Sequence, residues 1–445
     1  MVYIGGLDFG TSGARMTVID TAEMVVAQTQ VSYALDTEKV WHHVWLAALA
    51  ELLQNLPVVV RQALGAIAFN GTSATVLLCD EAGEPVTDPL LYNDPCGQAH
   101  CFDLIDIAPP GSPVLSATSS LAKLLWWQAT LPPNIFQQAH FLMHQADWLA
   151  FQLHGQPGFS DYHNALKLGY DVGHLGYPDW LLNFGQPLRL TALLPQVQAP
   201  GTLLGRLTPA ASDRYSLPVG CAVIAGTTDS IAAFWASGAQ SPGEAVTSLG
   251  STLVVKLLSN TRVDDERYGI YSHRWGDLWL VGGASNTGGN VLTQFFSDAQ
   301  LKELSLKIPG HVPSGLNYYP LSQPGERFPI SDPSWPPQLT PRPQKKEQFL
   351  HGLLEGIARI EAQGYQLLQD LGATPLTKLF SAGGGAHNPT WTTIRQRYLS
   401  VPMETAASTD ASFGTARLAL AGWHHLNKNE GVPRHPNKIP YSRSH

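Results

Sequence analysis

Apolar residues recur at two different spacings along the chain, and these spacings predict which segments form strands and which form helices. Alternating apolar residues over 3–7 and 15–19 predict two strands on either side of a glycine-rich turn. Apolar residues at three- and four-residue steps predict helices over 41–56, 121–128 and 145–153. The N-terminal part therefore mixes strands with helices.

Short apolar runs that end in small polar residues predict buried strands. The run 66–69 leads into a Gly-Thr-Ser turn and then into a strand over 75–79. The run 222–225 is followed directly by Gly226 and then by a Thr-Thr-Asp sequence that ends at Asp229. Ligand-contacting residues of α/β sheets lie at the carboxyl ends of such strands, so both turns are candidates for a binding site.

The pattern of the N-terminus returns near the middle of the chain, where strands over 245–257 flank a second glycine-rich turn. A chain of 445 residues also exceeds what one hydrophobic core usually organises. We therefore predict an α/β protein with two domains, 1–238 and 239–445, and a cleft between them. The proline-rich segment 321–346 is expected to be irregular, and a closing helix over 414–424 is a candidate to pack back on the first domain.

Composition and charge narrow the class of protein. The chain is 44% hydrophobic and 14% charged with a net charge of −8, which describes a globular protein and argues against nucleic acid as a partner. No apolar run approaches the roughly 18 residues of a membrane span, and the first strand leaves no room for a signal peptide. Four cysteines without Cys-x-x-Cys spacing fit a reduced compartment. We expect a cytoplasmic monomer or homodimer.

The two glycine-rich turns, residues 8–13 and 249–252, carry the first chemical signal. Each offers backbone N–H groups and hydroxyls without side-chain bulk, as phosphate oxygens require. One such turn is weak evidence, but a pair that opens both predicted domains indicates a phosphate chain gripped from two sides. The chain contains no Gly-Lys dipeptide, which excludes a Walker A loop. Residues 383–388 do not match the Gly-x-Gly-x-x-Gly motif of a dinucleotide-binding loop, because Asn388 stands where the motif requires its last glycine.

The ordered motifs together resemble those of the FGGY carbohydrate kinases, in the actin, hexokinase and heat-shock ATPase superfamily. The resemblance spans essentially the whole chain. Besides the two turns, its motifs are residues 226–229, 282–289, 315–333, 383–385 and 412–416. It implies two ribonuclease-H-like, actin-like ATPase domains that close on a sugar and ATP.

The resemblance also implies two catalytic carboxylates. Asp229 matches the general base that accepts the proton of the attacking sugar hydroxyl; an aspartate is too weak to deprotonate a free alcohol, so it acts as the O–P bond forms. Its structural alternative is a helix N-cap, because Asp229 and Ser230 precede an apolar run. Asp8 resembles the carboxylate that holds Mg²⁺ through water and borders the sugar.

The same resemblance implies the ATP contacts. Hydroxyls and glycines of the two turns would contact the β- and γ-phosphates, with ordinary turn capping as the alternative for the hydroxyls: Thr11, Ser12, Gly250, Ser251 and Thr252. Further ATP-binding residues by resemblance are Gly283, Gly384, Gly385, Asn388 and Trp391. Trp391 either stacks on adenine or belongs to the core.

The sugar site is where the chain departs from related kinases. Residues 70–73 carry neither the Met-His pair usual in xylulose kinases nor the Arg-Glu pair of glycerol kinases. The small hydroxyl residues there resemble the ribulose-phosphorylating branches, and the whole chain is similar to cyanobacterial and plant plastid sugar kinases assigned to D-ribulose. Ser73 would bind the sugar together with Asp8 and Asp229. Further polar candidates are Asn93, Asp94, His163 and Asn164.

The resemblance thus predicts an ATP- and Mg²⁺-dependent kinase that converts D-ribulose to D-ribulose 5-phosphate. A D-xylulose kinase, or a kinase of another pentulose or a polyol, is the alternative within this class. A non-catalytic sugar or nucleotide sensor and a plain ATPase are the alternatives outside it.

Overall fold

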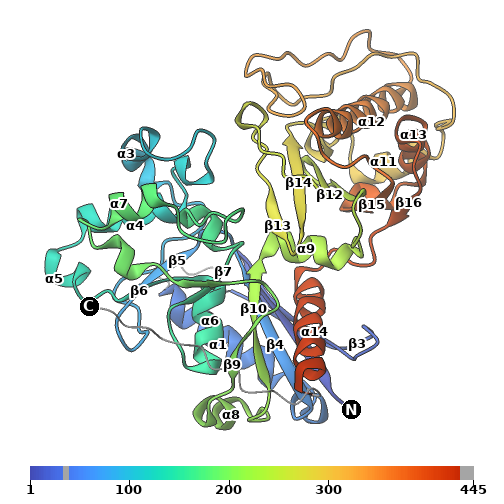
Figure 1. The fold of residues 1–445 in the computed structure, drawn as a ribbon. Helices are drawn as coiled ribbons and strands as arrows, with labels where there is room; N and C mark the ends of the chain where they lie inside the picture. The colour runs from blue at the N-terminus through green and yellow to red at the C-terminus, as the bar shows by residue number, and fades with distance from the viewer. Residues whose placement is uncertain (34–39, 431–445) are drawn as a thin grey trace.

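The computed structural model describes residues 1–33 and 40–430, which fold into two lobes, each built around a six-stranded sheet (Figure 1). The sheet of the first lobe has the strand order β3-β2-β1-β4-β10-β9. Its strands are β1 (Tyr3–Phe9), β2 (Gly13–Ile19), β3 (Val25–Ser32), β4 (Leu64–Gly71), β9 (Leu203–Arg206) and β10 (Ala222–Thr228). The central strands β1, β4 and β10 run parallel to one another, which places their carboxyl ends at one edge.

Helices and two small sheets complete the first lobe. The helices are α1 (Trp41–Gln54), α2 (Val58–Arg61), α3 (Cys101–Ile105), α4 (Ser120–Thr130), α5 (Pro133–Phe136), α6 (Gln145–His154), α7 (Asp179–Gly185) and α8 (Pro209–Tyr215). The small sheets pair β5 (Val76–Cys79) with β6 (Phe141–His144), and β7 (Phe159–Asp161) with β8 (Gln196–Gln198).

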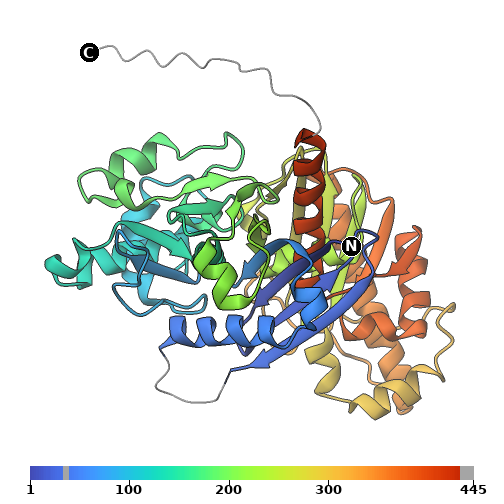
Figure 2. The same cartoon turned by 90° about the horizontal axis from the view of Figure 1, so that it is seen from below.

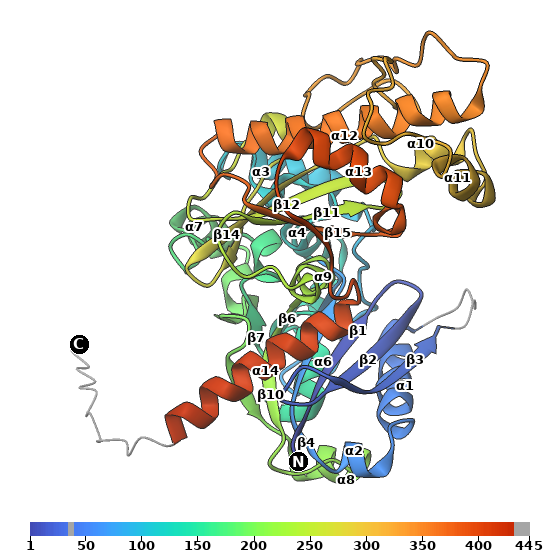
Figure 3. The same cartoon turned by 90° about the vertical axis from the view of Figure 1, so that its right-hand side faces the viewer.

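Alternating residues of the first sheet face two different layers. Ile67 and Phe69 of β4 pack with α1 and α6, whereas Ala66 and Ala68 face the last helix, α14 (Ala411–Glu430). The side-chain period of two in a strand produces this division. Small alanines on one face let α14 lie close to the sheet, as the two rotated views show (Figures 2 and 3).

Glycine makes the approach of α14 possible at two points. A Cβ on Gly6 would lie 2.1 Å from the backbone nitrogen of Ala416, and a Cβ on Gly414 would lie 1.8 Å from the carbonyl oxygen of Ala232. Ala232 belongs to α9 (Asp229–Ser237), so α14 packs against both the first sheet and α9. Helix α14 therefore lies against the first lobe.

The second lobe repeats the plan. Its sheet has the order β13-β14-β12-β11-β15-β16. The strands are β11 (Glu244–Leu249), β12 (Leu253–Ser259), β13 (His273–Trp275), β14 (Leu278–Ser285), β15 (Lys378–Ala382) and β16 (Met403–Thr405). The helices are α10 (Gly289–Thr293), α11 (Asp298–Ser305), α12 (Lys346–Asp370) and α13 (Pro389–Leu399). None of the helices in the described residues is long and apolar enough to cross a membrane.

A buried ion pair lies at the centre of the second lobe. Arg395 of α13 donates two hydrogen bonds of 2.7 Å to Glu361 of α12, and both side chains are completely buried. A third hydrogen bond from Arg395 reaches the hydroxyl of Ser381 on β15. This network joins two helices to the sheet.

The helices and strands predicted from apolar spacing are confirmed, including the two glycine-rich hairpins. Of the segment 321–346, expected to be irregular, residues 321–345 contain neither helix nor strand, and α12 begins at Lys346. Strand β3 was missed, because its residues are exposed or half-exposed along its whole length and leave little alternation to detect. The short strands β6, β7, β8 and β13 were missed as well, whereas β5 matches the strand predicted over 75–79.

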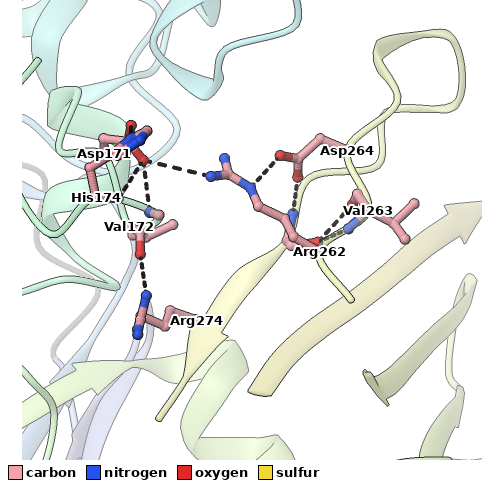
Figure 4. Close-up of polar contacts among 9 residues, drawn as sticks. Asp171, Val172, His174, Arg262, Val263, Asp264 and Arg274 are labelled. Carbon is pink, nitrogen blue, oxygen red and sulfur yellow. Dashed lines mark hydrogen bonds and ion pairs between the residues drawn. The ribbon is translucent and has the colours of Figure 1, made fainter. Parts of the chain in front are cut away.

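The two lobes also touch through a polar contact beside β13 (Figure 4). Arg262 bridges Asp171 of the first lobe, at 3.6 Å, and Asp264 of its own lobe, at 2.6 Å. Arg274 donates a hydrogen bond to the carbonyl oxygen of Val172. These contacts join the lobes through side chains. They are separate from the covalent connection, in which the chain passes from one lobe to the other through α9.

Candidate active site

Three predicted site residues lie where neighbouring parallel strands end. Asp8 lies near the end of β1 opposite Asn70 of β4, and Asn70 pairs in turn with Thr227 of β10. Ser73 follows β4 by two residues, and Asp229 follows β10 directly. The parallel order of these strands brings the three side chains to one edge of the first sheet.

Asp229 begins helix α9 but does not cap it. The N-cap residue is Thr228, and the Asp229 carboxylate accepts a hydrogen bond of 2.6 Å from the backbone nitrogen of Ser230. Burial raises the pKa of Asp229, opposed by that hydrogen bond and by the positive charges of Lys256 and Lys167. A carboxylate with an increased affinity for protons is suited to act as a general base.

Asp8 is held in an unfavourable electrostatic environment. Burial, together with the negative charges of Asp229 and Asp410, raises its pKa to about 7, and Arg15 only partly opposes this. A divalent cation would relieve the repulsion among these carboxylates. The hard oxygen donors therefore fit Mg²⁺, which keeps several waters and takes only one or two protein carboxylates. The described residues contain no group of three or more His, Cys, Asp or Glu side chains arranged as a metal site.

We predict that Asp8→Asn makes the Mg²⁺-free protein more resistant to unfolding. The raised pKa means that the folded state holds a proton more tightly than the unfolded state, so Asp8 lowers the stability as pH rises from about 4 to about 7. The gain from the substitution should grow over that range and stay constant above it. Urea unfolding at pH 5 and pH 8, without Mg²⁺, measures the difference.

The control for this prediction is Asp277→Asn, which removes an exposed carboxylate from the second lobe. A gain from Asp8→Asn that is as large at pH 5 as at pH 8 would contradict the proposed electrostatic origin.

The loop after β4, which the resemblance predicts to bind the sugar, leaves one hydroxyl free. Asn70 is fully buried and donates a hydrogen bond of 2.7 Å to Thr415 of α14, and Thr72 bonds to Gln145 and Thr75. Ser73 is half-buried and makes no hydrogen bond within the described residues. Ser73 is therefore the member of this loop that can accept a new partner.

The additional polar candidates have structural partners. His163 donates from Nε2 to the carbonyl oxygen of Arg274 at 2.6 Å, and its Nδ1 accepts from the Thr227 hydroxyl at 2.7 Å. Burial lowers the pKa of His163 to about 4, so the ring is neutral. Asn164 bonds to Asp161, and Asp94 accepts from the backbone of Cys96. Asn93 is exposed on the turn before it.

The first glycine-rich turn, residues 8–13, is a tight hairpin with an open tip. The backbone nitrogen of Gly10 donates to the carbonyl oxygen of Gly13 at 3.0 Å, and the side chains of Thr11 and Ser12 are exposed. The carbonyl oxygen of Ser12 accepts from the backbone of Tyr33, which fixes the turn against the segment that follows β3. Both hydroxyls are accessible to a ligand.

Glycines of the second lobe form a backbone cradle. A Cβ on Gly383, whose φ is +80°, would lie 2.9 Å from the carbonyl of Leu249, beside Gly250. Gly289 donates to the carbonyl oxygen of Gly250 at 2.8 Å, so a third loop meets the same turn. No atom outside its chain neighbours lies within 4 Å of a Cβ on Gly384. The cradle therefore leaves open space at Gly384.

Trp391 is a core residue. It is 3% exposed, its indole N–H donates to the carbonyl oxygen of Leu354, and its ring lies directly under Gly385. Asn388 caps α13 by accepting from the backbone of Trp391. Gly283 of β14 packs against the ring of Phe328 and lines an inter-lobe cavity on β14.

Three charged residues near Asp8 and Asp229 were missed at the sequence level. Lys256 and Lys167 are electrostatic neighbours of Asp229, and Asp410 is one of Asp8. Each lysine stands alone in an otherwise apolar segment, which is a signal that could have singled it out. Asp410 gave no signal, because only the return of the chain into α14 brings it to the site.

Comparison with known proteins agrees with this arrangement. Residues 3–235 match the N-terminal domain of the FGGY family of carbohydrate kinases, and residues 245–423 match the C-terminal domain. The chain is 24% identical to a xylulose kinase of Bacillus subtilis, over 88% of this chain and 82% of that kinase. It is 23% identical to an L-fuculokinase of Salmonella typhi, over 94% of this chain and 91% of that protein.

A solved structure has the same fold. The structure of a xyloylose kinase from Brucella ovis superposes with a TM-score of 0.82 at 21% identity, covering 95% of this chain and 91% of that one. The two-domain, actin-like ATPase fold expected from the sequence is therefore confirmed. Both family domains are matched in order along nearly the whole chain, and the protein belongs to the FGGY family of carbohydrate kinases.

Proposed function

We propose that the protein transfers the γ-phosphoryl group of ATP to a small ketose. The specific substrate that we propose is D-ribulose, and the product is D-ribulose 5-phosphate. The observation that carries the proposal is the pair of carboxylates at the ends of β1 and β10. Burial and the negative charges of Asp229 and Asp410 raise the pKa of Asp8, and the free hydroxyl of Ser73 lies at the same edge of the sheet.

In the proposed reaction a sugar hydroxyl oxygen attacks the γ-phosphorus. The new O–P bond forms as the bond between that phosphorus and the leaving ADP oxygen breaks, and the hydroxyl proton passes to Asp229. Holding both substrates in line can lower the barrier by roughly 7 to 11 kcal/mol. Mg²⁺, held by Asp8 through water, would neutralise phosphate charge.

The glycine cradle and the open tip of the first turn support ATP binding between the lobes. Thr11 and Ser12 are exposed on one lobe, and Ser251 is exposed on the other, in the second glycine-rich turn. In this proposal Gly384 and Gly385 form the floor for adenine. Trp391 supports that floor from below instead of stacking on the base.

The choice of D-ribulose rests on the loop that carries Ser73. Its small hydroxyl residues leave the position near Asp8 without a large side chain. D-Xylulose is the competing substrate, since the relatives include kinases named for xylulose.

We predict that ADP release, measured in a coupled assay, is stimulated by D-ribulose more than by D-xylulose, other pentuloses or polyols. Mass spectrometry of the product should show one added phosphate. Greater stimulation by D-xylulose would replace the proposed substrate but keep the kinase. ADP release that no sugar stimulates would contradict the kinase and favour a plain ATPase.

A further inference from the structure

Lys256 is the lone charged residue of strand β12. Its neighbours Val255 and Leu257 pack into the core of the second lobe together with Tyr365 of α12. Because side chains alternate along a strand, Lys256 points to the opposite sheet face, toward α9. Its Nζ donates a hydrogen bond of 2.8 Å to the carbonyl oxygen of Ser230, the residue after Asp229. The second lobe thus places an ammonium group beside the predicted general base.

Lys256 lines a cavity of about 470 Å³ between α9 and the second sheet. Small residues keep this space open on both sides: Ser230, Ala233, Ser248, Gly282 and Ala284. Gly383 of the glycine cradle lines the same cavity, so it continues toward the proposed ATP site. A phosphate-sized group has room there.

The donors of Lys256 are only partly used. An ammonium has three N–H donors, and the contact with Ser230 accounts for one. Burial lowers the pKa of Lys256 to about 8, and the negative charge of Asp229 partly opposes this change. The ammonium of Lys256 forms no salt bridge with the Asp229 carboxylate within the described residues. Lys256 is half-buried at the wall of the cavity, and its remaining N–H donors can reach an anion there, so the site favours an anionic partner.

His273 supplies a second unpartnered group in the same cavity. Its Nδ1 atom is buried and has no hydrogen-bond partner within the described residues. Burial and the charges of nearby Lys256 and Lys167 lower the pKa of His273 well below its usual value. A neutral ring can donate one hydrogen bond to an oxygen of an anion.

We propose that Lys256 and His273 bind the phosphoryl group as it passes from ATP to the sugar. This inference rests on the proposed kinase function and adds two groups from the second lobe to it. As the bond to ADP breaks and the bond to the sugar oxygen forms, Lys256 would stabilise negative charge on the phosphoryl oxygens. Asp229 takes the proton of the attacking sugar hydroxyl. Lys256 lies close to this proton transfer as well as to the phosphoryl group, because its hydrogen bond goes to Ser230, next to Asp229, and not to the Asp229 carboxylate itself.

The test compares Lys256→Met with Lys302→Met, which removes an exposed lysine of the same lobe. We expect Lys256→Met to lower kcat by about 10²–10³-fold, the usual effect of losing one donor to a developing oxyanion, with KM for ATP and for sugar changed less than threefold. The control should keep the wild-type kcat. A complex of ADP, aluminium fluoride and sugar, which mimics the transferring phosphoryl group, should bind wild type tightly and Lys256→Met weakly.

A merely structural lysine would give a different result. If Lys256 only ties the lobes together, Lys256→Met should lower the midpoint of thermal unfolding and raise KM while leaving binding of the aluminium fluoride complex intact. A kcat within threefold of wild type would overturn the proposal. If Lys256→Met does not fold, His273→Gln decides, with a smaller loss of kcat expected and no loss overturning the role of the site.

Binding experiments separate this inference from the kinase proposal. Calorimetry with inorganic phosphate, a non-hydrolysable ATP analogue and the sugar phosphate measures the anion site without turnover. Phosphate binding that is lost in Lys256→Met supports the site even if no sugar stimulates ADP release. Equal binding of all three ligands to wild type and Lys256→Met overturns it even if the kinase is active. The analogue and the sugar phosphate distinguish whether the anion belongs to ATP or to the product.

Discussion

Replacing Asp229 with alanine is expected to lower kcat for sugar phosphorylation by about 10²–10⁴-fold, the range of a general base. The side chain follows β10 at the edge that also carries Asp8, and burial raises its pKa. The loss should appear in kcat because the proton moves only as the O–P bond forms. A coupled ADP assay at saturating ATP and sugar measures it, and calorimetry should show ATP binding unchanged.

Asp213→Ala is the matched control, since it removes an exposed carboxylate from α8 of the same lobe. Asp229→Asn keeps the shape and the contact with Ser230 through its amide oxygen, and it should lose nearly as much activity as alanine. Equal rates for wild type and Asp229→Ala would exclude the assigned base. A protein that binds sugar and ATP without any turnover would instead be the sensor considered from the sequence.

The second large effect concerns stability. Glu361→Gln or Arg395→Met should each lower the free energy of unfolding by about 3–5 kcal/mol, because either change leaves the other group of a fully buried pair without its countercharge. Urea unfolding followed by tryptophan fluorescence measures this loss. The paired replacement Glu361→Leu with Arg395→Met should recover much of it, since apolar residues of similar size do not require a partner.

The control pair is Glu303 and Lys307, which form an ion pair on the exposed surface of α11 and the residues that follow it. Glu303→Gln should leave the unfolding curve unchanged, because exposed pairs are screened by water and salt. A loss from Glu303→Gln as large as that from Glu361→Gln would mean that burial does not determine the effect.

Those parts of the site that lie within one strand and its adjoining turn could be predicted from the sequence. The strand and turn around Asp8 and the strand that ends before Asp229 could be read from alternation and glycine, and so could the second glycine-rich hairpin. The raised pKa of Asp8 could not be predicted from the sequence, because burial, its largest cause, and the approach of Asp229 and Asp410 depend on the folded chain. Lys256 was missed for a similar reason. Its meaning depends on the sheet face it occupies and on the helix that covers that face.

The buried pair of Arg395 and Glu361 was equally invisible at the sequence level. Both residues are common on exposed helix surfaces, and their spacing along the chain gives no sign that they meet. Only the packing of α12 against α13 removes them from water. Such residues are found by tertiary structure and not by pattern.

The position of α14 has a consequence for how the protein is made. Ala66, Ala68 and Ile224 are covered by a helix that begins only at residue 411. While the ribosome is still synthesising the second lobe, all strands of the first sheet have already been made. One face of that sheet nevertheless stays uncovered, because α14 has not yet been synthesised. The nascent chain therefore exposes an apolar face while residues 229–410 are synthesised, and the first lobe completes its folding only after α14 has emerged.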